Sequence, residues 1–258
     1  MAQVIDGGIP LPSGVLGAPP AAAPADAATL GPRGAPRQGA RRKEIDHRAM
    51  KLIVGSIAIL MAPLVWLLAY AVDHEVIDSV SASYWQAGPA HVVFIGFLFA
   101  IAAFLFAYRG YTTAEDHWST VAALAAVCIA VFPCSYPGES SPYAAVHYGA
   151  ATVLFLILAW FCWGFYRRAR DKQQIFPRAR RRARIYIGCA AVMLACIAVM
   201  GLDEVTHWFT DWRRNATFIF EGIALIAFGV CWFVAGRFLR SLTDEGERYS
   251  PRREVNPE

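Results

Sequence analysis

Histidine, acidic and serine side chains gather near one end of a series of long apolar segments. They are three candidate metal ligands, His91, His147 and His207, two acidic residues, Asp203 and Glu221, and two serines, Ser81 and Ser83. In a zinc hydrolase, histidines hold the metal, the metal activates a water molecule and a carboxylate handles the proton. The set therefore fits a metal-dependent membrane hydrolase that acts on lipid-like substrates at the outer face.

Two of these histidines also fit a different cofactor. His91 and His147 lie near the starts of two apolar segments, at comparable depth, where they could serve as the axial ligands of a haem group. Cysteine gives no such signal, because none of the six cysteines forms a C-x-x-C pair and five lie inside apolar segments. Zinc and haem are therefore the two cofactors that the histidines allow.

Glu221 is the most informative single residue. It lies about five residues inside the last apolar segment, which places it roughly 7 Å below the start of a helix at 1.5 Å per residue. An ionised carboxylate at that depth is costly unless it is paired, protonated or exposed to a cavity, so a functional role is the default hypothesis. It could be the proton-coupled group of a small-solute transporter. Pairing with Arg213 or Arg214 would instead make it structural.

Six apolar segments position these residues. They are predicted over Met50–Val72, Pro89–Tyr108, Trp118–Ser135, Tyr143–Tyr166, Ile185–Leu202 and Ala216–Leu239. About 20 apolar residues match the roughly 30 Å hydrocarbon core of a bilayer, and segments surrounded by lipid must be helical because their backbone groups have no other partners. Mean hydropathy is +0.38. The sequence therefore predicts an all-α, polytopic membrane protein with a six-helix bundle.

Small residues mark the helix faces that we expect to approach one another closely. Two groups stand out, Gly96 with Ala100 and Ala103, and Gly222 with Ala227 and Gly229.

The distribution of lysine and arginine predicts the orientation of the bundle. The segment before the first span and the connection between spans four and five are rich in arginine, whereas 73–88 and 136–142 contain neither lysine nor arginine. Basic loops stay on the cytoplasmic side, so both termini are expected inside. Only Arg213 and Arg214, which precede the last span, do not fit this charge pattern. The protein is therefore expected in the cytoplasmic (inner) membrane as a multi-pass protein.

The regions outside the spans differ in composition from the spans. Residues 1–45 are rich in Ala, Pro and Gly and are predicted to be a disordered cytoplasmic arm, followed by the transmembrane domain at 46–241 and a polar cytoplasmic tail at 242–258. The basic stretches flank spans and form no separate basic domain, so nucleic acid is not an expected partner. The expected partners are the bilayer and its anionic lipids.

Several short motifs resemble an uncharacterised family of bacterial six-helix membrane proteins. They are Ser81-Ala-Ser-Tyr-Trp85, His91-Val-Val-Phe-Ile-Gly, Tyr108-Arg-Gly-Tyr111, Phe132-Pro133, Val146-His147-Tyr148 and Phe220-Glu221-Gly-Ile-Ala-Leu. His91 and Val92 stand where the family pattern has Arg and Asp. The six-helix plan is also distantly similar to the eukaryotic DRAM, Frag and Sfk-like membrane proteins. The resemblance implies a membrane location and leaves the activity open.

The leading functional hypothesis is a membrane module that binds a lipid or a partner protein and has an outward-facing polar pocket. Arginines of the connection between spans four and five would hold anionic lipid headgroups at the inner surface. They are Arg178, Arg180, Arg181, Arg182 and Arg184. The hydrolase, the haem-binding subunit and the transporter are the alternatives. The hydrolase resembles the alkaline ceramidase-like superfamily, but the His-x-x-x-His pair of that superfamily's last helix has no counterpart in span six.

Overall fold

The computed structural model describes residues 47–74, 76–135, 141–206 and 215–247, and the following account concerns these residues. They form six long helices, α1 (His47–Asp73), α2 (Pro89–Ala107), α3 (Thr113–Val131), α4 (Ala144–Asp171), α5 (Ala179–Thr206) and α7 (Ala216–Ala235). Two short 3₁₀ helices, η1 (Ser81–Trp85) and η2 (Glu245–Glu247), accompany them. Each of the six is long and apolar enough to cross a membrane. The prediction of a six-helix, all-α membrane protein is confirmed.

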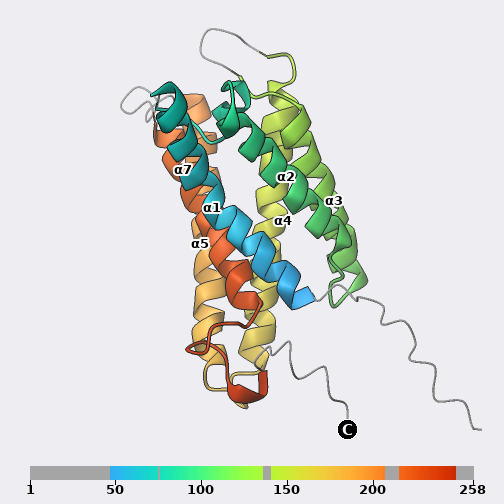
Figure 1. Ribbon diagram of the computed structural model, residues 1–258. Helices are drawn as coiled ribbons and strands as arrows, with labels where there is room; N and C mark the ends of the chain where they lie inside the picture. Colours follow the sequence, from blue (N-terminus) through green and yellow to red (C-terminus); the bar gives the residue numbers. More distant parts are fainter. Residues whose placement is uncertain (1–46, 75, 136–140, 207–214, 248–258) are drawn as a thin grey trace, which may run out of the picture. The chain divides into compact units, whose positions relative to one another are not determined.

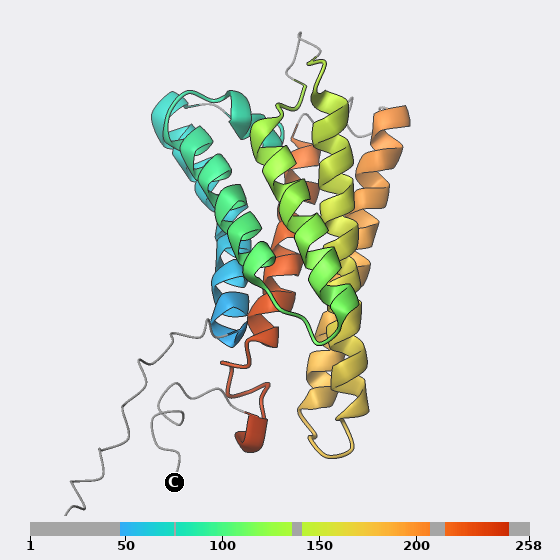
Figure 2. The same ribbon diagram turned by 90° about the vertical axis from the view of Figure 1, so that its right-hand side faces the viewer.

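The six helices form a closed ring in the order of the sequence. Each helix packs on its neighbours along the chain, and α7 closes the ring by packing on both α5 and α1. Figures 1 and 2 show the helices running alternately up and down, with η1 above the start of α2 and the connection from α4 to α5 at the opposite end. Helix α7 also makes a smaller contact with α4, the helix beyond α5 in the ring.

The outer faces of the helices carry large apolar side chains. More than two fifths of the surface of Leu60, Phe106, Leu124, Leu156 and Leu194 is exposed. In water such a surface would be unfavourable, whereas in a bilayer it contacts lipid chains. The polar residues of interest are therefore confined to the two ends of the ring.

Helices α1 and α7 approach each other at two glycines. A Cβ atom placed on Gly229 would lie 2.6 Å from the carbonyl oxygen of Gly55, and one placed on Gly55 would lie 2.7 Å from that of Gly229. The absence of side chains on both residues permits this backbone contact. The expectation for Gly229 is met, whereas Gly96 has no atom within 4 Å of an added Cβ and lies on an exposed face. Gly96 therefore does not mediate a helix contact.

Several helices extend beyond their apolar stretches. Helix α3 begins five residues before the predicted Trp118, because Thr112 caps its N-terminus by accepting a hydrogen bond from the Glu115 amide at 3.2 Å. It ends at Val131, two residues before Pro133. Helix α4 continues into the arginine-rich connection, where cations favour a helix C-terminus.

The start of the predicted polar tail is folded. Arg182 on α5 donates a hydrogen bond to the Leu242 carbonyl at 2.7 Å, and Arg178 donates to the carbonyls of Arg240 and Thr243 at 2.9 and 2.8 Å. We call residues 239–247 the C-terminal segment. It lies against the connection between α4 and α5, so ordered structure continues past the predicted boundary at residue 241. The predicted arm at 1–45 lies outside the described residues.

Candidate functional site

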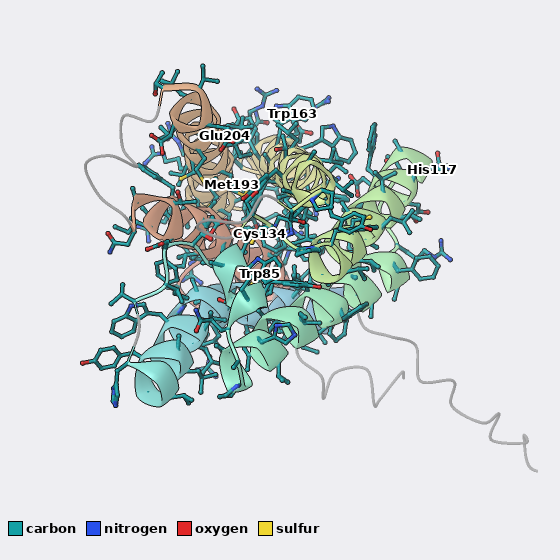
Figure 3. All side chains as sticks on the ribbon, turned by 90° about the horizontal axis from the view of Figure 1, so that it is seen from above. Trp85, His117, Cys134, Trp163, Met193 and Glu204 are labelled. Atoms are coloured by element: carbon teal, nitrogen blue, oxygen red, sulfur yellow. The ribbon has the colours of Figure 1, made fainter. Side chains whose placement is uncertain are left out.

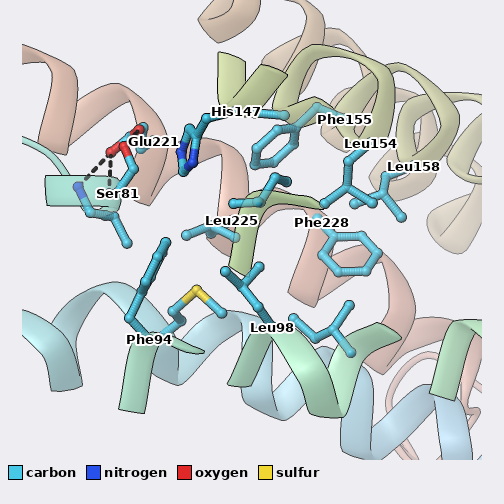
Figure 4. A pocket seen from close by; sticks show the side chains of 15 residues that line it. Ser81, Phe94, Leu98, His147, Leu154, Phe155, Leu158, Glu221, Leu225 and Phe228 are labelled. Carbon is cyan, nitrogen blue, oxygen red and sulfur yellow. Dashed lines mark hydrogen bonds between the residues drawn. The ribbon is translucent and has the colours of Figure 1, made fainter. Parts of the chain in front are cut away.

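Glu221 binds the backbone that leads into η1. Its Oε2 atom accepts hydrogen bonds from the amides of Val80 and Ser81, at 2.5 and 3.4 Å, and its Oε1 atom accepts one from the Ser81 hydroxyl at 2.7 Å (Figure 4). All three partners are donors, which suits an ionised carboxylate. The carboxylate also lies at the N-terminus of η1, where a negative charge is favourable. The structure thus brings Glu221 and Ser81 together and gives the carboxylate a structural partner.

The two described histidine candidates also hold backbone groups. Nδ1 of His147 lies 2.7 Å from the Phe132 carbonyl oxygen, and Nδ1 of His91 lies 2.5 Å from that of Tyr84. A carbonyl only accepts hydrogen bonds, so each Nδ1 is the donor. That arrangement is also common around bound metals. The histidine tautomers alone therefore do not decide between a structural and a metal-binding role.

The remaining residues needed for a zinc site are not assembled in the described part of the chain. There, no group of three or more histidine, cysteine, aspartate and glutamate side chains lies close enough to hold a metal ion. His207 lies outside the described residues. Asp203 is buried in the last turns of α5, and Ser83 is completely buried. Of the proposed hydrolytic set, Glu221 and Ser81 are hydrogen-bonded to each other, and His147 lines the same cavity.

A small cavity runs inward from Glu221. Glu221, Ser81 and His147 line its outer end, and Phe94, Leu98, Leu154 and Phe228 are among the apolar residues below them (Figure 4). Its volume is about 60 Å³, which corresponds to roughly two water molecules in the liquid. Ligand pockets for drug-sized molecules are several times larger. This cavity is therefore too small for a lipid.

Cys134 completes the cluster at this end of the bundle. Burial and the nearby charge of Glu221 raise the pKa of Cys134 to about 11, so the thiol stays protonated at neutral pH. It donates to the Ser81 carbonyl at 3.3 Å, and the Trp85 indole donates to the Cys134 carbonyl at 3.0 Å. Viewed from above, the Trp85 and Cys134 side chains lie together near the middle of the ring, whereas His117 and Glu204 lie at its periphery (Figure 3).

A larger pocket occupies the opposite end of the bundle. Five cationic side chains line it, those of Lys51, Arg168, Lys172, Arg182 and Arg237. Aromatic rings of Tyr111, Phe165 and Tyr186 line it as well, and its volume is about 240 Å³. We call it the basic pocket. Its residues come from α1, the connection between α2 and α3, α4, α5 and the end of α7, so the fold assembles it from the whole length of the chain.

Lys51 forms part of the buried floor of the basic pocket. Only 6% of its surface is exposed, and its Nζ atom lies 4.9 Å from the ring centre of Phe165 and 5.3 Å from that of Tyr108. Ring faces attract a cation but do not neutralise it. Among the described residues, no carboxylate lies within ion-pair distance of Lys51. A buried ammonium in this position attracts an anion.

Two carboxylates partly balance the other cations. Glu115, in the first turn of α3, pairs with Arg168. Glu247, in η2, pairs with Arg182 at 2.5 Å, with Arg237 at 3.2 Å and with Lys172 at 3.7 Å. Burial alone would raise the pKa of Glu247, but the Arg182 hydrogen bond and these positive charges outweigh it and hold the pKa below its ordinary value. Glu247 is therefore ionised at neutral pH. Counted by formal charge, the five cations and two carboxylates leave an excess of three positive charges.

Some polar atoms at the basic pocket have no hydrogen bond. Nη2 of Arg168 is buried and has no hydrogen-bond partner among the described residues. Oε1 of Glu247 lies 3.2 Å from Nη1 of Arg237 and 3.7 Å from Nζ of Lys172, but neither contact has hydrogen-bond geometry. Buried polar atoms normally find partners, because leaving one unsatisfied costs about 1–3 kcal/mol. The side chains of the basic pocket therefore do not provide hydrogen bonds for all of its buried polar atoms.

Arg237 has a backbone conformation that arginine rarely adopts. Its φ is 61°, in the left-handed region that glycine favours at the end of a helix. That conformation costs a residue with a side chain about 1–2 kcal/mol. Such strain often accompanies a functional side chain, and here the side chain lines the basic pocket.

The arginines predicted to bind headgroups divide into two groups. The guanidinium groups of Arg178 and Arg182 bind the C-terminal segment, and Arg182 is only 2% exposed. Arg180, Arg181 and Arg184 are exposed. Only the second group is presented at the surface as expected. Arg182 instead belongs to the floor of the basic pocket.

Sequence analysis did not identify several residues of the basic pocket as a site. Lys51 falls at the start of the first predicted span, and Glu115 precedes the predicted start of the third span at Trp118. A local signal for Glu115 existed, because Thr112-Thr113-Ala114-Glu115 has the spacing of a capping box at a helix start. No local signal could join Glu247 to Arg182, since 65 residues separate them in sequence.

Comparison of the chain with family models, with curated proteins and with solved structures gave no match in any of the three. Functional conclusions therefore rest on the geometry of the two ends of the bundle.

Proposed function

We propose that the protein is a multi-pass membrane module that binds an anionic lipid in its basic pocket. The observation that supports this proposal is the pocket itself, with five cationic side chains, two paired carboxylates and a buried Lys51 that has no carboxylate partner among the described residues. Anionic headgroups are attracted to lysine and arginine near a membrane surface by about 1 kcal/mol per residue. A preformed, partly desolvated pocket strengthens that attraction.

The proposal includes an orientation. The basic end would face the cytoplasm in the inner membrane of a bacterium, in accord with the positive-inside rule, and the Glu221 cavity would open outward. The exposed Arg180, Arg181 and Arg184 would then lie near the anionic headgroups of the inner leaflet. The resemblance to the bacterial six-helix family agrees with this location and remains a prediction.

No observation at the outer end favours a second function. Glu221, His91 and His147 each bind backbone groups of neighbouring segments. These contacts explain their positions without a substrate, and the cavity beside them is small. We therefore do not put forward the hydrolase, haem or transporter hypotheses as the function.

Competition between two lipids tests the proposal. The protein is purified from nanodiscs that contain equal amounts of phosphatidylglycerol and phosphatidylcholine with identical chains, and the retained lipid is counted by native mass spectrometry. We expect the wild type to retain phosphatidylglycerol and Lys51→Met to retain about tenfold less, since removing a buried charge costs 1.4 kcal/mol or more.

Two further variants separate binding from folding. Arg237→Gly removes a pocket cation and relieves the left-handed strain, so we expect weaker lipid retention with an unchanged or slightly higher melting temperature. Arg109→Gln removes an exposed cation at the same end, outside the pocket, and should change neither quantity. Equal retention of both lipids by the wild type would contradict the proposal.

A further inference from the structure

A carboxylate of the protein itself borders the basic pocket and contacts its cations. The Glu247 carboxylate lies within 4 Å of Arg182, Arg237 and Lys172, three of the five cations that line the pocket. It is buried, with 5% of the residue exposed, yet its Oε1 atom receives no hydrogen bond from the described residues. Glu247 thus neutralises part of the pocket without satisfying all of its polar atoms.

The two ends of this contact lie on different elements. Arg182 lies on α5 in the ring and also donates to the Leu242 carbonyl. Glu247 lies in η2, at the end of the C-terminal segment. A local movement of η2 would withdraw the carboxylate from these cations while Leu242 stays bound to Arg182.

The charge balance indicates which ligand can replace Glu247. A ligand with one negative charge would exchange one anion for another and leave the excess of positive charge unchanged. A ligand with two or more charges would reduce that excess and would bring enough oxygen atoms to reach Lys51 and the unsatisfied Nη2 of Arg168. Multiple charge-assisted hydrogen bonds are the strongest contacts available to such an oxyanion.

We propose that the basic pocket is a site for a phosphomonoester or diphosphate headgroup, and that this group displaces the Glu247 carboxylate when it binds. The inference rests on the proposed lipid-binding function and narrows its ligand class. The pocket volume, about 240 Å³, corresponds to roughly eight water molecules in the liquid, which is room for one or two phosphoryl groups. Lys172 and Arg168, at 47% and 31% side-chain exposure, form its rim and give access from the surface.

The first test compares phosphatidic acid with phosphatidylglycerol of identical chains. The first headgroup is a phosphomonoester and the second a phosphodiester with one charge. In wild-type protein we expect phosphatidic acid to be retained about tenfold better, the effect of one further charge-assisted hydrogen bond. Glu247→Gln removes the competing charge, so phosphatidylglycerol retention should rise more than phosphatidic acid retention and the tenfold preference should shrink.

The second readout follows η2 directly. Hydrogen exchange of residues 242–247 should speed up when phosphatidic acid binds to the wild type and should stay unchanged with phosphatidylglycerol. Arg109→Gln should behave as the wild type in both measurements. Glu247→Gln removes a buried ion-pair partner and is expected to lower the melting temperature. A single cooperative unfolding transition of this variant, together with the behaviour of Arg109→Gln, excludes misfolding as the cause of any difference.

The outcomes separate the two proposals. Equal retention of the two anionic lipids, with no effect of Glu247→Gln, overturns the phosphomonoester site and leaves the lipid-binding function standing. Retention of neither lipid over phosphatidylcholine overturns both. Competition by glycerol 3-phosphate at equal concentration would confirm the phosphomonoester chemistry and identify a soluble ligand as its source.

Discussion

Glu221 shows how a single buried charge can be explained by its hydrogen bonds. Its two oxygen atoms accept three hydrogen bonds from residues that lie 140 or 141 positions earlier in sequence, and these bonds fix η1 against α7. The depth of Glu221 was predictable from the sequence, because its distance from the start of the apolar segment sets it. Its hydrogen-bond partners were not predictable, because nothing in the sequence marks the backbone amide of Val80 as a partner of Glu221.

The Glu221→Gln variant tests this structural interpretation. A glutamine places an amide NH₂ group opposite donors, so one or two hydrogen bonds to a charged acceptor are lost, and we expect destabilisation by about 1–3 kcal/mol. Thermal unfolding in detergent measures the effect. Glu204→Gln is the matched control, since Glu204 is exposed and should change stability by less than about 0.5 kcal/mol. Equal, small effects of the two changes would contradict a structural role for Glu221.

Helices are the elements that sequence analysis located best. All six predicted segments overlap an observed helix, because a long apolar run in lipid has no alternative to helical hydrogen bonding. Their ends were less accurate where polar residues continue the helix. Thr112 starts α3 before the apolar residues begin, and α4 continues to Asp171 past the predicted end at Tyr166.

The basic pocket lies in these polar extensions of the helices. Lys51, Arg168 and Arg182 belong to helical turns near the ends of α1, α4 and α5, where hydropathy changes from apolar to charged. A hydropathy profile identifies such turns only as the charged ends of membrane spans. Which flanks meet depends on the order of helices around the ring, and the sequence carries no direct record of that order.

The crossing of α1 and α7 gives a prediction at the scale of helices. Gly229→Leu would place a side chain against the Gly55 backbone, and we expect destabilisation by about 1–3 kcal/mol from overpacking, or failure of the ring to close. Gly96→Leu is the control, because nothing lies within 4 Å of an added Cβ there. Thermal unfolding of both variants in the same detergent distinguishes them. Equal stability of the two variants would contradict the close crossing.

The whole molecule has two chemically different ends. At one end, Glu221, His91, His147 and Cys134 hydrogen-bond to backbone groups around a small cavity. At the other end, cations outnumber carboxylates around a pocket of about 240 Å³. A membrane protein with this asymmetry has a preferred orientation, because retaining basic residues on the cytoplasmic side favours one of the two insertions.

Cysteine labelling in intact cells tests that orientation. Single cysteines are introduced as Ala87→Cys, between η1 and α2, and as Gln173→Cys, between α4 and α5, in a chain whose native cysteines are replaced. Both positions are exposed, whereas Ser83 in η1 is completely buried and would not react. An impermeant maleimide should label Ala87→Cys from outside and should label Gln173→Cys only after the membrane is opened. The reverse pattern would place the basic pocket on the external surface, where the inner-leaflet lipids cannot reach it.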